Sequence, residues 1–381
     1  MIFEPIMDYL NSREVYLADV YAPPFIYSIG CHLFNIHNHV EPVYFEGGKI
    51  PHIPLHLCFT APAGFMKSFF QTLFVGDAYS ILHGVENLPT TQITEITTAG
   101  LIGGHEINKW TNTTEEVPGL VDEYKYGIIA TEEFDAITSS SKMGYNSTME
   151  HQLLTILDRG IYTKRTKMGE KTNKVFTTFW IANQPDKQIN VGSGIMRRFL
   201  HLLYAPTPDE FEVFREKWWK QKGIKPSSEE LHVIRARISN FRSMLRQIRR
   251  IGFDDSVYKF YSKHNLLPYE CTIFDRVLIG HHLTVYGADE VILIGIDKEV
   301  RAHLNRFIKW KTAISIGADL YQIYRLIQSE NSHGIDMKTL YRLLVKLNIN
   351  TGNFEDKISR LRKSGIVKLK DGKLTIANEV M

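Results

Sequence analysis

Short apolar runs alternate with helical patterns through the first half of the chain. The runs cover residues 55–60, 127–131 and 175–182, and each is bounded by turn-forming residues. Runs of this length indicate strands that are buried on both faces, and helical stretches between them are typical of a parallel sheet. Residues 51–207 are therefore expected to form an α/β core.

The segments on either side of this core have other patterns. Residues 1–50 are rich in aromatic residues and proline and lack a clear period, which predicts a lead-in of short helices and turns. Residues 208–318 follow a helical period, and Pro208, Ser227 and Asp289 are the expected helix starts. This segment is expected to be helical throughout.

The last segment, residues 319–381, predicts a small separate domain. Apolar positions recur at helical spacing over 319–330, 336–347 and 353–364. Alternating apolar and polar residues then surround Asp371-Gly372, a pair that is typical of a tight hairpin turn. Three short helices followed by a hairpin predict a winged helix-turn-helix.

Composition narrows the class of protein. The 381 residues include 44% hydrophobic and 23% charged residues, the balance of a globular protein, which excludes a fibrous or wholly disordered chain. No run reaches the roughly 18 apolar residues that a membrane-spanning helix needs, and the N-terminus lacks the features of a signal peptide. Cys31, Cys58 and Cys271 lie far apart, which argues against a disulfide scaffold or a zinc ribbon. We expect a reduced, cytoplasmic protein with no membrane partner.

The net charge of +3 is uninformative, but its distribution is not. Residues 231–250 contain six arginines and no acid, and residues 357–373 contain seven Lys or Arg and one acid. Two basic segments in a nearly neutral chain favour local contact with an anion, first of all a nucleic acid. Two solvated helix faces would give the same pattern.

The segment after the first run has the features of a phosphate-binding loop. It consists of Ala61, Pro62, Ala63, Gly64, Phe65, Met66, Lys67 and Ser68. Such a loop needs a strand, a tight turn whose backbone N–H groups point inward, and a Lys followed by a hydroxyl at a helix start. Gly64 supplies the turn, whereas Ala61 and Met66 stand where the usual pattern has glycine. By itself the match also fits an ordinary strand–turn–helix.

Three further motifs follow in the order that a nucleotide hydrolase requires. The second run ends in Glu132 and Glu133, and carboxylates at such a strand end can hold magnesium and orient the attacking water. The third run ends in Asn183, whose amide could reach a γ-phosphate. Arg197 and Arg198 precede another apolar strand, and one of them could act as an arginine finger on a neighbour's nucleotide. Each motif also has an ordinary explanation when it is taken alone. The two glutamates could form an acidic surface turn, Asn183 could simply end a strand, and the two arginines could be surface charges.

In this order the motifs resemble those of an AAA+ ATPase, and within that class those of the minichromosome maintenance (MCM) replicative helicases. The family's lead-in Ala-Pro-x-Ile-Tyr-Gly is similar to residues 22–27, and its Ser-Ala-Ala-Gly-Leu-Thr segment is similar to residues 97–102. Its phosphate loop also lacks the last glycine, as at Met66. Its Ser-Arg-Phe-Asp motif aligns with residues 197–200.

The resemblance covers roughly residues 20–310. It implies a nucleotide-binding core with a helical lid at 208–318, ATP and Mg2+ as ligands, and a homo-oligomeric ring, a hexamer, that acts on DNA in replication. The family's N-terminal domain, with its oligonucleotide-binding fold and zinc site, has no counterpart in residues 1–50. The chain therefore resembles a trimmed motor, of the kind that a mobile element or a virus carries.

Each matched residue is expected to take the role of its counterpart. The resemblance implies that Lys67 contacts the β- and γ-phosphates and that Ser68 and Glu132 hold magnesium. It also implies that Glu133 activates water and that Asn183 is the first sensor of the γ-phosphate.

The resemblance also implies roles for two arginines and for one hairpin. Arg198 would be the arginine finger, and Arg276 is the nearest option for a second sensor. Residues 160–169 match a hairpin that enters the central pore of the ring in this family. Its basic residues would touch the DNA backbone, and they are Lys164, Arg165 and Lys167.

Departures from the family pattern leave the rate of hydrolysis open. Ala61 replaces a glycine, Glu132 is one methylene longer than the usual Asp, and Leu200 replaces the Asp of the finger motif. The alternative function is a DNA-binding initiator or regulator that uses ATP as a switch and hydrolyses it slowly or not at all. A third hypothesis is a protein-remodelling ATPase, which has the same nucleotide-binding core but whose ATP turnover DNA would not stimulate.

Overall fold

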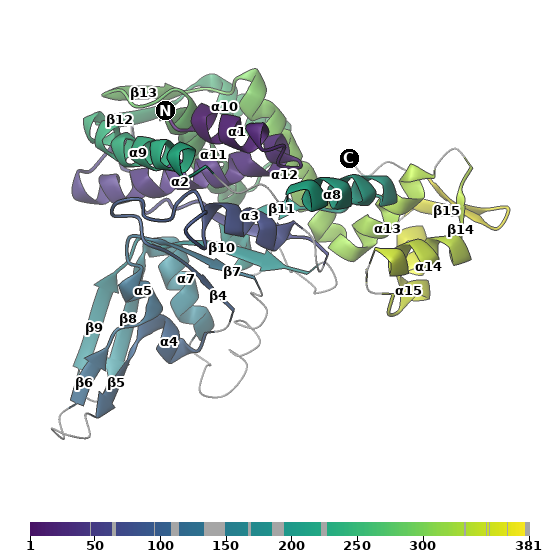
Figure 1. Ribbon diagram of the computed structural model, residues 1–381, viewed down its shortest axis with the longest axis horizontal. Coiled ribbons are helices and arrows are strands. Elements are labelled where there is room, and N and C mark those ends of the chain that lie inside the picture. Colours follow the sequence, from purple (N-terminus) through teal and green to yellow (C-terminus); the bar gives the residue numbers. More distant parts are fainter. Residues whose placement is uncertain are drawn as a thin grey trace.

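A computed structural model gives the architecture of the chain (Figure 1). The residues that it describes are 1–45, 47–62, 66–94, 96–107, 114–132, 149–166, 169–184, 194–221, 227–330, 333–347, 349, 351–363 and 365–377.

Helices and short strands alternate through these residues. The helices are α1 (Phe3–Ser12), α2 (Ala18–Val40), α3 (Lys67–Phe74), α4 (Thr98–Ile102), α5 (Leu120–Glu123), α7 (Met149–Arg159), α8 (Pro208–Gln221), α9 (Ser228–Met244), α10 (Asp255–Lys263), α11 (Pro268–Val285), α12 (Lys298–Ile316), α13 (Ala318–Ser329), α14 (Met337–Lys346) and α15 (Phe354–Lys363), with the 3-10 turns η2 (Met196–Arg198) and η3 (Leu245–Gln247). The strands are β1 (Tyr44–Phe45), β2 (Gly48–Lys49), β3 (His56–Thr60), β4 (Thr90–Ile93), β5 (Gly104–Ile107), β6 (Thr114–Val117), β7 (Ile128–Thr131), β8 (Ile161–Thr166), β9 (Gly169–Lys174), β10 (Thr178–Asn183), β11 (Phe199–Leu203), β12 (Arg250–Phe253), β13 (Val291–Ile294), β14 (Ile335–Asp336), β15 (Val367–Lys370) and β16 (Lys373–Ile376).

A five-stranded parallel sheet is the centre of the fold, as the apolar runs predict. Its strand order is β11-β3-β10-β7-β4, and each neighbouring pair is parallel. Every residue of β3, β7, β10 and β11 is buried, because helices cover both faces of the sheet. The α/β class expected for this part of the chain is confirmed.

The two faces of the sheet are packed into separate apolar cores. On one face, Leu57, Phe59 and Trp180 join a large core built mainly by α1, α2, α9, α11 and α12. On the other face, Cys58 and Ile181 join a smaller core that includes α7. Trp180 is fully buried against Phe25 of α2, and its indole N–H donates to Ser28 Oγ at 2.8 Å.

The expectation of short helices in residues 1–50 is wrong, because α2 is 23 residues long. All of its residues from Tyr21 to Asn38 are buried, so the helix has no solvent face and shows no amphipathic period in the sequence. Pro23 and Pro24 each remove one backbone donor near its start, a loss that burial of the rest of the helix offsets.

Two glycines allow α2 and α11 to pack closely. A Cβ atom at Gly280 would lie 2.3 Å from the carbonyl oxygen of Tyr27, and one at Gly30 would lie 2.5 Å from Thr284 Cγ2. Both distances are shorter than van der Waals contact, so any larger residue would force the two helices apart.

Residues 208–318 are mainly helical, as predicted, but they also supply two strands. β12 and β13 pair in parallel, and β12 also pairs in parallel with β1, which joins this segment to the N-terminal one in a single sheet. Helices α8 and α9 begin at Pro208 and after the cap Ser227, as expected. Asp289 lies before β13 rather than before a helix, and Asp297 caps α12 instead.

The C-terminal unit contains three helices and a three-stranded antiparallel sheet, β14-β16-β15. The predicted hairpin is present, and both turn residues have positive φ, 50° at Asp371 and 76° at Gly372. Ion pairs connect this unit to α8: Arg325 contacts Glu210 at 3.0 Å and Lys346 contacts Glu212 at 3.1 Å. In Figure 1 the unit extends away from the α/β body beside α8.

All three cysteines are free thiols, as their spacing predicts. None of the helices in the described ranges combines the length and the apolar character that crossing a bilayer requires.

Buried histidines predict that acid destabilises the fold. Burial lowers the pKa of His32, His201 and His303 from 6.5 to about 4 in each case. The unfolded chain therefore binds more protons between pH 6.5 and pH 4, and stability that is complete above pH 6.5 is lost as the pH falls. The loss reaches about 3 kcal/mol for each histidine across this window.

Urea unfolding at pH 7.5 and at pH 5 measures this effect. We expect a clearly lower urea midpoint at pH 5. Asp275 and Glu299 act in the opposite direction, because burial raises the pKa of both, that of Asp275 from 3.8 to about 6, but they are two groups against several histidines. An equal midpoint at the two pH values would contradict the prediction.

Candidate nucleotide site

The candidate phosphate loop joins β3 to α3 at the carboxyl edge of the parallel sheet. Ala61, which follows β3, donates its N–H to the carbonyl oxygen of Asn183 at 3.2 Å, and α3 begins at Lys67. The first N–H groups of a helix have no partner within the helix, and the helix dipole favours negative charge at this end. Lys67 is only 6% exposed, so its side chain is buried at the start of α3.

Strand order makes this edge a natural ligand site. From β3 the chain passes to β4 at one side of the sheet, returns through β7 and β10, and then places β11 on the other side of β3. The order therefore reverses around β3, and ligands of open α/β sheets bind beyond the carboxyl ends of the strands at such a point.

Three buried oxygens near this edge lack hydrogen-bond partners in the described part of the chain. They are Thr60 Oγ1, Thr131 Oγ1 and Asn183 Oδ1, at the ends of β3, β7 and β10. Asn183 is the register partner of Thr60, and Thr131 is the partner of Ile181, so alternation along the strands puts all three on one face. Buried polar atoms are rarely left unpaired, so these oxygens fit a bound water, ion or ligand.

Glu132 and α3 are held to the same part of the sheet by amide side chains. Gln92 of β4 donates to the Glu132 carboxylate at 2.7 Å. Gln71 of α3 is fully buried and donates to the carbonyl oxygens of Thr131 and Trp180, at 3.3 Å and 3.0 Å. Gln71 therefore fixes the helix that begins at Lys67 against the strand that precedes Glu132.

Several predicted site residues lie outside the described residues. They are Ala63, Gly64, Phe65, Glu133 and Lys167. Of the remaining ones, seven lie together at one edge of the sheet: Ala61, Pro62, Met66, Lys67, Ser68, Glu132 and Asn183. The predicted amide-ended strand and the strand before Glu132 are both present.

Arg198 lies at the opposite edge. It immediately precedes β11, whose first residue Phe199 is the register partner of His56, the first residue of β3. The full length of β3, about 13 Å for five residues, therefore separates the level of Arg198 from that of the phosphate loop. Arg198 therefore does not reach the candidate phosphate loop of its own chain.

An ion pair fixes the Arg198 guanidinium. Its Nε donates to Asp158 Oδ1 at 2.5 Å, its Nη2 contacts Asp158 Oδ2, and its Nη1 donates to the carbonyl oxygen of Gly194. A guanidinium has five N–H donors, so this arrangement leaves two of them for another acceptor. Arg197, the neighbouring residue, is exposed.

Arg276 does not fit the role of a second sensor. It is 7% exposed, and its Nη1 donates at 3.0 Å to the carbonyl oxygen of Pro54, which lies before β3 at the amino edge of the sheet. Burial lowers the pKa of this guanidinium. Because its guanidinium is buried and bonded to Pro54, it is not open to a nucleotide of its own chain or of a neighbour.

The hairpin that the sequence predicts after α7 is present. β8 and β9 pair antiparallel from Ile161 opposite Lys174 to Thr166 opposite Gly169, and Lys164 and Arg165 belong to β8. A second hairpin, β5–β6, was not predicted, because its strands are mostly polar and lack an apolar face. Both hairpins project from the body of the protein in Figure 1.

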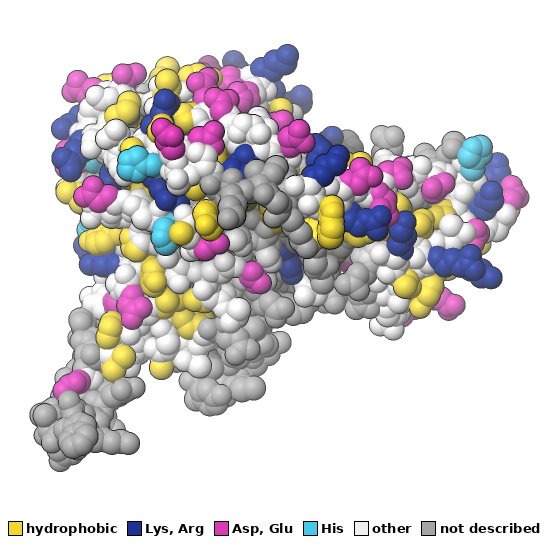
Figure 2. All heavy atoms as spheres, viewed as in Figure 1, with side chains coloured by type: hydrophobic (Ala, Val, Ile, Leu, Met, Phe, Trp, Pro, Cys, Tyr) yellow, Lys and Arg dark blue, Asp and Glu magenta, His cyan; other side chains and the backbone are white. Residues whose placement is uncertain are grey.

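The two basic segments, residues 231–250 and 357–373, differ in how many of their Lys and Arg side chains contact other parts of the protein. In the first, three of the six arginines bind neighbouring segments: Arg235 donates to Ala78 O and Ser80 O, Arg242 donates to Asn87 O, and Arg249 pairs with Glu41. In the second, only Lys357 has an ion pair among the described residues, and the other six are exposed: Arg360, Arg362, Lys363, Lys368, Lys370 and Lys373. Figure 2 shows several Lys and Arg side chains on this C-terminal unit.

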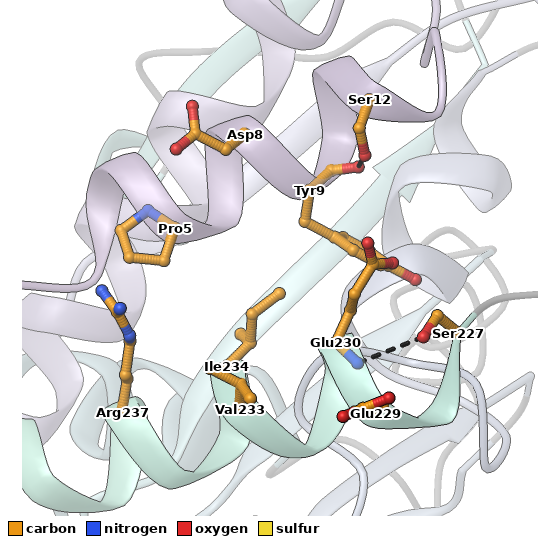
Figure 3. Close-up of a pocket in the computed structure, with 10 residues that line it drawn as sticks. All are labelled: Pro5, Asp8, Tyr9, Ser12, Ser227, Glu229, Glu230, Val233, Ile234 and Arg237. Carbon is orange, nitrogen blue, oxygen red and sulfur yellow. Dashed lines mark hydrogen bonds between the residues drawn. The ribbon is translucent and has the colours of Figure 1, made fainter.

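Two further observations concern metal ligands and the groove between α1 and α9 in the described part of the chain. No group of three or more His, Cys, Asp and Glu side chains in the described ranges could hold a metal ion. A groove of about 580 Å³ lies between α1 and α9, whose side chains face each other across it (Figure 3). Its lining includes Asp8, Glu229 and Glu230, and these three carboxylates would repel a triphosphate.

Comparison with known proteins does not add a relative. No protein-family model matches the sequence, and no curated protein matches it significantly.

Proposed function

We propose that the chain is an ATP-driven DNA motor of the AAA+ type, similar to the MCM helicases, that works as a ring in DNA replication. One observation carries this proposal. Three parallel strands end at one edge of the sheet, where α3 begins at the buried Lys67 and Glu132 and Asn183 lie at the neighbouring strand ends.

The proposed roles follow from the chemistry of each side chain. Lys67 neutralises charge on the β- and γ-phosphates, and the N–H groups at the start of α3 bind phosphate oxygens. Glu133 orients the attacking water. The Asn183 amide binds the γ-phosphate, and its unpaired Oδ1 fits the attacking water as an acceptor.

The donor set also fits Mg2+. A hydroxyl from Ser68, a carboxylate from Glu132 and ordered waters are the oxygen ligands that this ion prefers. When bound, Mg2+ neutralises the charge that develops on the phosphate oxygens during hydrolysis. Gln92 holds the Glu132 carboxylate beside the site through its 2.7 Å hydrogen bond.

The position of Arg198 at the edge opposite Lys67 supports a ring. In the proposed assembly, Arg198 of one subunit stabilises the transition state at its neighbour's nucleotide. Hydrolysis would then move the β8–β9 hairpin with Lys164, Arg165 and Lys167 past DNA, gripping phosphates without reading sequence. The C-terminal unit, as a winged helix, would add contacts to DNA through its exposed basic residues.

ATP turnover by the wild type and by Glu133→Gln, with and without DNA, tests this proposal. We expect turnover that DNA stimulates in the wild type. The Glu133→Gln variant should bind ATP normally and lose turnover by at least 100-fold, because it lacks the carboxylate that orients water. Unchanged turnover in this variant would refute the catalytic assignment.

The second candidate function is that of a DNA-binding initiator or regulator that ATP switches. The longer Glu132 carboxylate, already held by Gln92, and the side chain of Ala61 in the loop both favour slow hydrolysis. In that case the wild type binds ATP and DNA but shows no turnover, and ATP changes its affinity for DNA. Turnover that DNA does not affect would instead favour a protein-remodelling ATPase.

A further inference from the structure

A basic hollow lies at the root of the β8–β9 hairpin, away from the nucleotide site. Its volume is about 260 Å³, and it is lined by the end of α2, residues 49–52, the end of α7 and the first and last residues of the hairpin. α7 ends and β10 begins at this edge of the sheet, so the hollow and the phosphate loop lie at opposite ends of the strands.

Three cations from three elements surround this hollow. They are Lys49 of β2, Arg159 of α7 and Lys174 of β9, and all three are exposed. None of the three has a carboxylate within ion-pair distance in the described chain, and no lining residue is acidic. Unpaired like charges around one concave surface repel one another, and a bound anion would relieve that repulsion.

The floor of the hollow is rigid. Asn35 accepts the N–H of Ile53 at 2.9 Å, and Asn38 donates to the carbonyl oxygen of Ile50 at 3.0 Å. These two amides fix the segment that carries Lys49 to the end of α2. The site is therefore formed before any ligand binds, which lowers the cost of binding.

Aromatic rings continue the surface beside the cations. Phe176 lines the hollow, lies 4.3 Å from the His39 ring, and stacks on Tyr126 with ring centres 5.5 Å apart. Tyr126 is 40% exposed, and Lys125 lies over its ring. Phe176 itself is only 5% exposed, so the rings that a base could reach are those of Tyr126 and His39. Exposed aromatic rings beside unpaired cations suit a single strand of nucleic acid, since bases stack while the cations hold the backbone.

We propose that this hollow binds the phosphodiester backbone of single-stranded DNA where the strand reaches the root of the hairpin. The identity of the ligand rests on the proposed function, whereas the anion site rests on the arrangement of Lys49, Arg159 and Lys174. Lys164 lies three residues further along β8 than Ile161 at the root, about 10 Å. One strand can therefore contact the hairpin and the hollow together.

The triple variant Lys49→Ala, Arg159→Ala, Lys174→Ala of the full chain tests this assignment. Its affinity for a fluorescein-labelled oligothymidine is measured by fluorescence anisotropy over a range of salt concentrations. We expect at least tenfold weaker binding and a salt slope smaller by about 2, because three phosphate contacts on a single strand are lost. Lys49→Arg, Arg159→Lys, Lys174→Arg, which keeps the charges, should retain most of the affinity.

The matched control removes three other exposed cations, with Lys259→Ala, Lys263→Ala and Arg301→Ala on α10 and α12. It changes the net charge equally and should bind within twofold of the wild type. Equal losses in the two triple variants, an unchanged affinity in the first, or a loss seen only with duplex DNA would each overturn the assignment.

The same variants separate this inference from the proposed motor. ATP turnover without DNA should stay within twofold of the wild type in the Lys49 triple variant, since the hollow lies at the other edge of the sheet. A wild type without turnover whose DNA affinity still depends on the hollow would refute the motor alone. Turnover stimulated by DNA in a variant that binds DNA normally would refute the hollow alone.

Discussion

Lys67→Ala is expected to weaken ATP binding by at least 100-fold and to abolish turnover. Lys67 is the first residue of α3 and is 6% exposed, so its ammonium group would meet a phosphate in a largely water-free site. Removing one member of a buried, hydrogen-bonded charge pair costs about 2–5 kcal/mol, which corresponds to this loss of affinity. Titration with a fluorescent ATP analogue, with Mg2+ present, measures it directly.

Thr72→Ala is the matched control, because Thr72 lies on the same helix with its side chain exposed. This variant should bind ATP within twofold of the wild type. A thermal melt without nucleotide shows whether each variant is folded. Normal ATP affinity in a folded Lys67→Ala protein would show that the loop before α3 is not a phosphate site, and the whole functional proposal would fail with it.

The parts of the fold that were predictable are those with a local cause. The buried strands β3, β7 and β10 are continuous apolar runs, and only a strand covered on both faces tolerates such a run at that length. The Asp371-Gly372 turn needs two residues that accept positive φ, which few other pairs do. That Lys67, Glu132 and Asn183 lie at one edge was predictable because parallel strands bring their carboxyl ends together, whereas their roles stay predictions.

The parts that were missed depend on contacts between distant segments. Helix α2 is buried on every side, so its pattern does not separate a core face from a solvent face. Arg276 lies on a helix, as a second sensor would, but its bond to Pro54 is visible only once α11 is packed beside β3. Likewise, nothing in the sequence around Arg198 indicates that Asp158, 40 residues earlier, binds its guanidinium.

Arg198→Ala is expected to lower the turnover number by about 1,000-fold or more while leaving ATP affinity within a few-fold of the wild type. The reason is positional: Arg198 lies at the edge opposite the candidate phosphate loop of its own chain. In the proposed ring it would stabilise the transition state in a neighbour and would not hold the ground state in its own chain. Steady-state turnover and nucleotide titration on the same preparation measure the two quantities. Arg197→Ala, at the adjacent exposed position, is the control and should keep most of the activity.

Mixing two inactive variants tests whether Arg198 acts between subunits. A subunit with Lys67→Ala still has Arg198, and a subunit with Arg198→Ala still has Lys67. Where the first lies beside the second, one complete site forms, so the mixture should recover turnover that neither variant has alone. Asp158→Asn should also slow turnover, because the ion pair with Asp158 orients the two guanidinium N–H groups that remain for phosphate. No recovery in the mixture, despite subunit exchange shown by fluorescence energy transfer, would mean that Arg198 only anchors α7 to β11.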